Sequence, residues 1–164
     1  MTNIESGHTA PGFSLNGLDG EDYSLDSLLA RGPVVLAFFK ISCPVCQFTF
    51  PFLQRISERF SGKNVSVIGV SQDNARNTKE FNQEYGVTFP TLLDDEGYAV
   101  SNAYGLTNVP TVFLIAPDGT VKISCIGFDK AALEEISSEL AQFQKISVTP
   151  LFLPGEIVPA YKPG

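Results

Sequence analysis

Two cysteines separated by two residues, Cys43 and Cys46, are the residues of this sequence best suited to chemistry. They follow an apolar run over 34–39, and apolar side chains then recur at helical spacing as far as Phe60, which predicts a strand passing into a helix. The first N–H groups of a helix have no partner within it, and the helix dipole places partial positive charge at that end. A thiolate is stabilised there, so we expect the pKa of Cys43 to fall below about 8.5.

These positions predict a different role for each cysteine. Cys43 is expected to attack a partner disulfide as a thiolate, and Cys46, one turn further and more buried, to resolve the mixed disulfide by attacking Cys43. The reverse direction oxidises a dithiol. Lys40, three residues upstream, is the candidate for further tuning of the Cys43 pKa, and Pro44 and Val45 are expected to set the potential and to meet the substrate. The redox-active disulfide is the only cofactor expected.

Two structural alternatives compete with this redox interpretation. A zinc site needs four ligands, and besides the pair the sequence offers Cys125 and the single histidine, His8; we expect no metal. A pair of inert core cysteines is the second alternative, which the placement at a strand–helix junction disfavours. Three cysteines without a regular framework do not indicate a disulfide-stapled secreted scaffold, and Cys125 is expected to be a small buried apolar residue.

Composition and charge exclude several classes of protein. The chain of 164 residues is 43% hydrophobic and 18% charged, which is typical of one globular domain. Its formal charge of −7, without a run of Lys or Arg, makes nucleic acid an unsuitable partner. The longest apolar run, 34–39, is too short to span a membrane, and residues 1–10 do not resemble a signal peptide. We expect a cytoplasmic monomer, or a periplasmic or membrane-anchored protein if a leader has been removed.

The order of predicted elements indicates an α/β fold: a single domain over 1–164 with a central mixed β-sheet flanked by helices. An N-terminal β-hairpin precedes the sheet, and a Pro-rich extended tail over 146–164 follows it. The apolar residues of this tail are expected to dock on the domain itself. Strands are predicted at 13–15, 23–25, 34–39, 65–70, 89–93, 111–115 and 121–126, and helices at 26–30, 43–60, 74–85, 97–104 and after Asp129.

With the strand, the CxxC pair and the later Val109-Pro110-Thr111 in place, the sequence resembles the thioredoxin-like superfamily. Pro51 follows Cys46 by five residues, as in that family, and Pro110 matches the family's cis-proline. The resemblance implies that the backbone of Val109 lies beside the sulfurs and pairs with a bound substrate strand. It also implies protein disulfides or dithiols as partners, with an upstream thiol reductant.

Within that superfamily the sequence is most similar to TlpA/ResA-like thiol-disulfide oxidoreductases and to redoxin (AhpC/TSA-type) domains. The similar segments are 10–15, 85–90 and 109–115, and the resemblance covers roughly residues 10–143. Three positions depart from the pattern. Ser42 replaces a tryptophan before the first cysteine, and Thr49 and Ala37 replace the carboxylates that accept a proton near the buried cysteine in reductases and in thioredoxin, so the direction of electron flow stays open.

Peroxiredoxins share the fold and provide the rival enzyme class. Their peroxide-reacting cysteine aligns with Cys46, and Cys43 then occupies the place of their threonine. They also need a guanidinium that polarises the peroxide, and none is expected near Pro110. The arginines of the chain are Arg31, Arg55, Arg59 and Arg76. A non-catalytic binding module with the same fold is the third hypothesis, and the intact CxxC argues against it.

Overall fold

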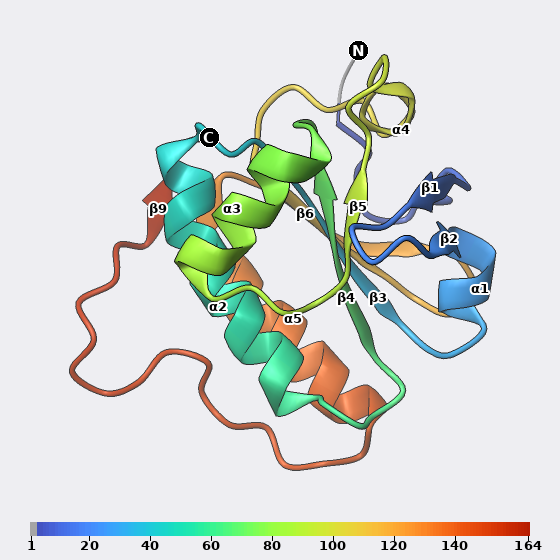
Figure 1. Ribbon diagram of the computed structural model, residues 1–164. Coiled ribbons are helices and arrows are strands. Elements are labelled where there is room, and N and C mark those ends of the chain that lie inside the picture. The colour runs from blue at the N-terminus through green and yellow to red at the C-terminus, as the bar shows by residue number, and fades with distance from the viewer. Residues whose placement is uncertain (1–2) are drawn as a thin grey trace.

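Five strands form the central sheet of the protein, whose computed structural model describes residues 3–164 (Figure 1). In their order across the sheet they are β5 (Thr91–Leu93), β4 (Ser66–Ser71), β3 (Val34–Phe39), β6 (Thr111–Ile115) and β7 (Val121–Ile126). β3, β4 and β5 are parallel, whereas β6 is antiparallel to β3 and β7 to β6. This arrangement confirms the predicted mixed sheet.

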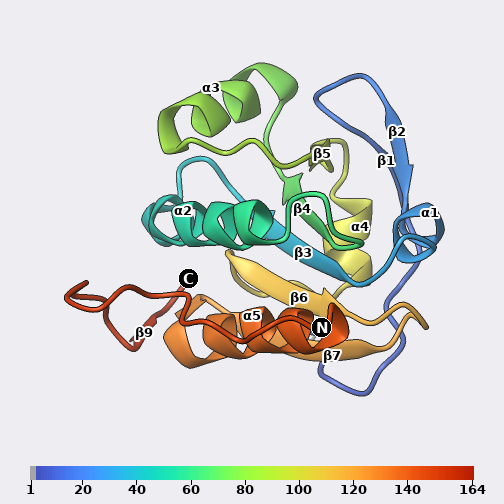
Figure 2. The ribbon, with the colours of Figure 1, turned by 90° about the horizontal axis from the view of Figure 1, so that it is seen from below.

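Helices cover both faces of the sheet (Figure 2). The helices are α1 (Leu25–Leu29), α2 (Pro44–Arg59), α3 (Ala75–Tyr85), α4 (Ala99–Ala103) and α5 (Lys130–Phe143). α2, α3 and α5 lie on one face, and α1 and α4 lie on the other. The predicted N-terminal hairpin is present as β1 (Ser14–Asn16) and β2 (Asp22–Ser24), beside α1.

The central strand β3 explains why its sequence is apolar without alternation. All six of its residues are buried. Val35, Ala37 and Phe39 pack in the core beneath α2, α3 and α5, while the alternate side chains pack in the core beneath α1 and α4. A strand covered on both faces needs apolar residues at every position. The carboxyl end of β3 therefore lies between the two cores, and α2 begins a few residues after it.

The C-terminal tail, residues 146–164, is docked on the domain through part of its apolar residues, whereas Leu153 and Ile157 are exposed, contrary to expectation. Leu151 and Phe152 are buried among side chains of the α2/α5 side of the core. The prediction of a tail without further elements missed β9 (Tyr161–Lys162). This short strand of the tail pairs antiparallel with β8 (Phe128–Asp129), which precedes α5. Two-residue strands are too short to show an alternating pattern, so no sequence signal marked them.

No helix within residues 3–164 is long and apolar enough to cross a membrane.

Candidate active site

Cys43 lies at the N-cap of α2, where the backbone is extended and the side chain faces the first turn. Its Sγ accepts a hydrogen bond from the Cys46 N–H at 3.2 Å, and its thiol donates to the carbonyl oxygen of Val109 at 3.4 Å. Pro44 follows at the first helical position, which suits proline because the missing N–H has no helical partner. Cys43 is half-buried, and its sulfur lies at the N-terminus of the helix.

Cys46 lies one turn into α2 and is completely buried. Burial raises the pKa of its thiol strongly, and the hydrogen bond with the Cys43 side chain raises it further. A buried thiol stays protonated and unreactive until a neighbouring group accepts its proton. The two cysteines thus have unlike environments, one accessible at a helix terminus and the other enclosed behind it.

The loop before β6 brings the predicted substrate-binding residues to the cysteines. The Val109–Pro110 peptide is cis, as the resemblance implied. Pro110 is buried and Val109 is half-buried, and the Thr111 hydroxyl donates to the carbonyl oxygen of Asn108 at 2.7 Å. The carbonyl of Val109 is therefore held beside the Cys43 sulfur.

The remaining predicted site residues lie around the same turn. Pro44 is exposed, whereas Val45 is half-buried and packs against the core. Lys40 is exposed, and its carbonyl oxygen accepts a hydrogen bond from the Cys43 N–H at 3.3 Å. That contact is a backbone one, and a tuning role for the Lys40 ammonium stays a prediction.

Two polar residues that the sequence interpretation missed hold the segment before Cys43. Asp73 accepts a hydrogen bond from the Ile41 N–H at 2.8 Å, and the Gln47 side chain donates to the Ile41 carbonyl oxygen at 2.9 Å. Asp73 follows β4, which is parallel to β3, so both strands end at the same edge of the sheet. The position of Asp73 directly after a predicted strand could have marked it as a site residue, because sites in open α/β sheets form at the carboxyl ends of the strands.

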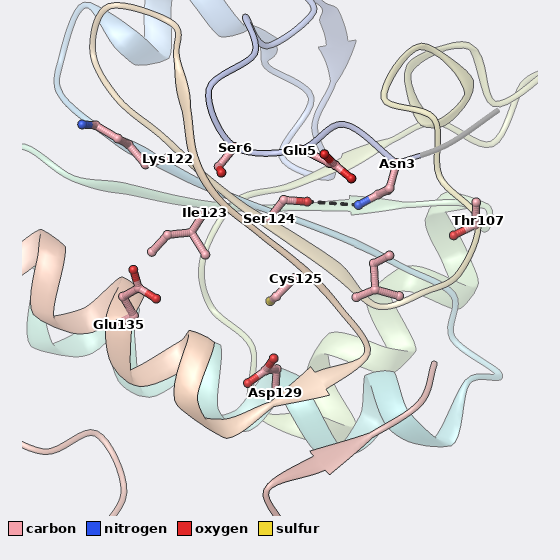
Figure 3. Close-up of a pocket in the computed structure, with 11 residues that line it drawn as sticks. Asn3, Glu5, Ser6, Thr107, Lys122, Ile123, Ser124, Cys125, Asp129 and Glu135 are labelled. Atoms are coloured by element: carbon pink, nitrogen blue, oxygen red, sulfur yellow. Dashed lines mark hydrogen bonds between the residues drawn. The ribbon is translucent and has the colours of Figure 1, made fainter.

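Cys125 lies on β7, separated from β3 by β6, and is buried as expected. Figure 3 shows it at a surface hollow that Asn3, Ser124 and Asp129 also line, where the Asn3 side chain donates to the Ser124 hydroxyl at 3.1 Å. Burial raises the pKa of Cys125 to about 12, and the charge of Asp129 adds to the effect. In the described part of the chain no three His, Cys, Asp or Glu residues gather as metal ligands would, so the zinc alternative gains no support.

A mixed sheet, a CxxC pair at the start of α2 and a cis-proline beside it define a thioredoxin-fold protein with a dithiol site. Residues 6–124 match the AhpC/TSA family, and the chain belongs to that family. The thiol-disulfide oxidoreductase ResA of Geobacillus thermodenitrificans is 32% identical over 74% of this chain and 69% of its own length. The predicted thioredoxin-like, ResA-like redoxin class, and with it the predicted class of enzyme, is confirmed.

Solved structures show the same fold. The thioredoxin domain of a thiol-disulfide oxidoreductase from Bacteroides vulgatus aligns with a TM-score of 0.74 and 21% identity, over 86% of this chain and 99% of that one. Peroxidoxin BcpB from Mycobacterium tuberculosis aligns with a TM-score of 0.69 and 24% identity, over 88% of this chain and 99% of its own. Because both classes share the fold, the choice between them depends on the side chains of the site.

Proposed function

We propose that this chain transfers electrons between its Cys43–Cys46 dithiol and the disulfides of other molecules, with Cys43 as nucleophile and Cys46 as resolving thiol. The observation that carries the proposal is the contrast between the two sulfurs. Cys43 is accessible at the N-terminus of α2 and touches the Val109 carbonyl, whereas Cys46 is completely buried one turn behind it.

The reaction proceeds in two exchanges. The Cys43 thiolate attacks one sulfur of the partner disulfide, and the other sulfur leaves as a thiolate and takes up a proton. Cys46 then loses its proton and attacks the Cys43 sulfur, forming the Cys43–Cys46 disulfide and releasing the second partner thiol. Two electrons pass from the dithiol to the partner, and an external thiol reductant restores the pair. The same steps in reverse oxidise a partner dithiol.

Nearby groups support this order of events. Helix N–H groups stabilise negative charge at Cys43. The buried Cys46 becomes reactive only when a mixed disulfide holds its target next to it. Asp73 is a carboxylate near the cysteine pair that the sequence did not predict. Its charge raises the pKa of Cys46, after the larger effects of burial and of the hydrogen bond with Cys43. We propose no bound cofactor beyond the disulfide itself, and protein or small-molecule disulfides as partners of a monomer.

The peroxidase alternative requires a guanidinium at the reacting sulfur, and the arginines of the described chain are placed elsewhere. Arg55 pairs with Glu156 of the tail, and Arg59 donates to carbonyl oxygens of the tail. Arg76 lies beside Glu80 on α3, and Arg31 follows α1, which packs on the other face of the sheet from α2.

Replacing Cys46 with Ser tests the assignment, because it removes the resolving thiol and leaves Cys43 to accumulate mixed disulfides. We expect partners trapped on Cys43 in the Cys46→Ser protein, identified by mass spectrometry, and none when Cys43 is replaced as well. Cys125→Ser is the matched control and should trap nothing. Trapping that persists through Cys125, or rapid formation of sulfenic acid on Cys46 in dilute peroxide, would overturn the proposal.

A further inference from the structure

The last four residues, 161–164, reach back to the active site and are called the terminal strap here. β9 within the strap pairs with β8, so that Lys162 lies opposite Phe128. The Lys130 N–H also donates to the Ala160 carbonyl oxygen at 3.0 Å. Figures 1 and 2 both place the end of the chain beside the first turn of α2.

The end of the strap packs directly on the backbone that precedes the cis-proline. A methyl group at Gly164 would overlap with the carbonyl oxygen of Val109, so the two backbones are already in close contact. The Asn108 side chain donates to the Gly164 carbonyl oxygen at 3.4 Å. The Val109 carbonyl thus has the Cys43 thiol and Gly164 as neighbours.

Gly127 joins the strap to the cis-proline loop. Its N–H donates to the Pro110 carbonyl oxygen at 2.7 Å, and a methyl group here would overlap with the carbonyl oxygen of Lys162. Its φ of +76° also lies in the region that glycine adopts most easily. The loop and the strap are therefore held against each other by a residue that has no side chain to separate them.

The strap also contacts α2 close to the cysteines. The Lys162 ammonium lies 4.8 Å from the centre of the Phe48 ring, and Phe48 follows Cys46 by two residues. An ammonium over an aromatic ring contributes about 0.5–1 kcal/mol at an exposed site. With this contact the strap bridges β8, α2 and the loop before β6, the three segments around the site.

Charged side chains of α2 and α5 hold the rest of the tail in place. Arg59 donates to the carbonyl oxygens of Thr149 and Pro150 at 2.8 and 2.7 Å. Arg55 pairs with Glu156, and the Glu134 carboxylate accepts from the N–H groups of residues 151 and 152. An anchored tail keeps the strap at a high effective concentration beside Val109.

We propose that the terminal strap restricts which disulfides the enzyme accepts, an inference that rests on the proposed function. A polypeptide substrate that lies along the Val109 backbone competes with Gly164 for that edge. A small disulfide needs only the exposed side of the Cys43 sulfur. The strap therefore favours low-molecular-weight disulfides over disulfides presented by an extended protein segment.

Two variants remove the strap from Val109 without changing a cysteine. One ends at Ala160 and lacks residues 161–164, and the other, Gly164→Ala, places a methyl group against the Val109 carbonyl. Ile157→Ser is the matched control, because Ile157 is a fully exposed residue of the same tail. Circular dichroism and urea unfolding establish that each variant is folded.

The test compares kcat/KM for insulin disulfides with kcat/KM for hydroxyethyl disulfide. We expect both strap variants to raise the insulin value about tenfold and to change the hydroxyethyl disulfide value less than about twofold, with Ile157→Ser unchanged. An unchanged ratio of the two values in folded variants overturns the role of the strap. If the unmodified protein reduces neither disulfide, or reduces them equally well after Cys43→Ser, the proposed function itself fails.

Discussion

At the scale of single residues, three cysteines of one chain have three different environments. Cys43 is half-buried at the start of a helix, with a carbonyl acceptor and an N–H donor beside its sulfur. Cys46 is enclosed and its pKa is raised by burial, and Cys125 is enclosed in another part of the core. Reactivity follows thiolate character and exposure. The position of each sulfur in the fold therefore supports the proposed roles, with Cys43 as nucleophile, Cys46 as resolving thiol and Cys125 as a core residue.

The raised pKa of Cys125 predicts a loss of stability at alkaline pH. The unfolded thiol loses its proton above its ordinary pKa of 9.0, whereas the folded one keeps it until about pH 12. The unfolded state then binds fewer protons, so the free energy of unfolding falls as pH rises through this window, by at most about 1.4 kcal/mol per pH unit. Below the ordinary pKa this contribution is fully present.

Cys125→Ala lacks this contribution, so the stability advantage of the unmodified protein over the variant should shrink by about 1 kcal/mol between roughly pH 9 and pH 10. Urea unfolding of both proteins under reducing conditions measures the difference. Other groups that titrate in this range are common to the two proteins and cancel. A constant advantage across the window would mean that the Cys125 thiol is not protected from ionisation in the folded state.

At the scale of elements, α2 has the proposed nucleophile, Cys43, as its N-cap. The Cys43 sulfur accepts the Cys46 N–H, the position at which many helices use a serine or threonine hydroxyl. Sulfur is a weaker acceptor than a hydroxyl oxygen. The chain therefore has a less effective cap at this position than serine would provide, and has the proposed nucleophile there.

Substituting Cys43 separates the two roles. Cys43→Ser should abolish disulfide exchange and leave the protein at least as stable as the reduced unmodified chain, because the hydroxyl caps α2 at least as well as the sulfur does. Cys43→Ala should abolish exchange too, and lower the free energy of unfolding by about 1 kcal/mol relative to Cys43→Ser. Urea unfolding of the two variants measures this difference, and equal stabilities would show that the N-cap bond adds nothing.

The elements most accessible to prediction were those with long apolar patterns or strong caps. The buried strand over 34–39 and the helix after Cys43 were predicted almost to the residue, and Asn74 and Asp129 cap α3 and α5. Asp73 could not be assigned from the sequence alone, because its contact with Ile41 joins residues 32 positions apart. The loop that the Asp73 side chain reaches depends on the order of the strands in the sheet, and a local sequence pattern does not reveal that order.

At the scale of the whole molecule, the tail depends on groups distributed over two helices. Its charged anchors are Arg55 and Arg59 on α2 and Glu134 on α5, and its apolar anchors are Leu151 and Phe152. Of these, only the apolar docking was expected from the sequence. The contacts of the strap with Val109 join the last residue of the chain to the loop before β6, a relation that only the assembled fold reveals.

The Arg55–Glu156 pair predicts that acid weakens docking of the tail. The Arg55 hydrogen bond, and then that of the Leu153 N–H, lower the pKa of Glu156 from its ordinary 4.5 to about 2. A carboxylate held ionised in the docked state contributes above its ordinary pKa, and the contribution is lost as pH falls through the window down to about 2. Glu134 also accepts N–H groups of the tail, so it is kept intact in the variants that isolate Glu156.

We expect the signals of the Phe152 ring in NMR spectra to shift toward those of an exposed ring as pH falls from about 4.5 toward 2. Glu156→Gln should weaken docking at neutral pH and remove most of this dependence, because an amide does not titrate. Glu139→Gln, at an exposed carboxylate of α5, is the matched control and should behave like the unmodified protein. The same acid dependence in the Glu156→Gln protein would assign the release to another carboxylate. If the strap covers Val109, acid release should also raise the ratio of the rates at which a bulky and a small maleimide alkylate Cys43. We expect this ratio to rise as pH falls in the unmodified chain but not in Glu156→Gln.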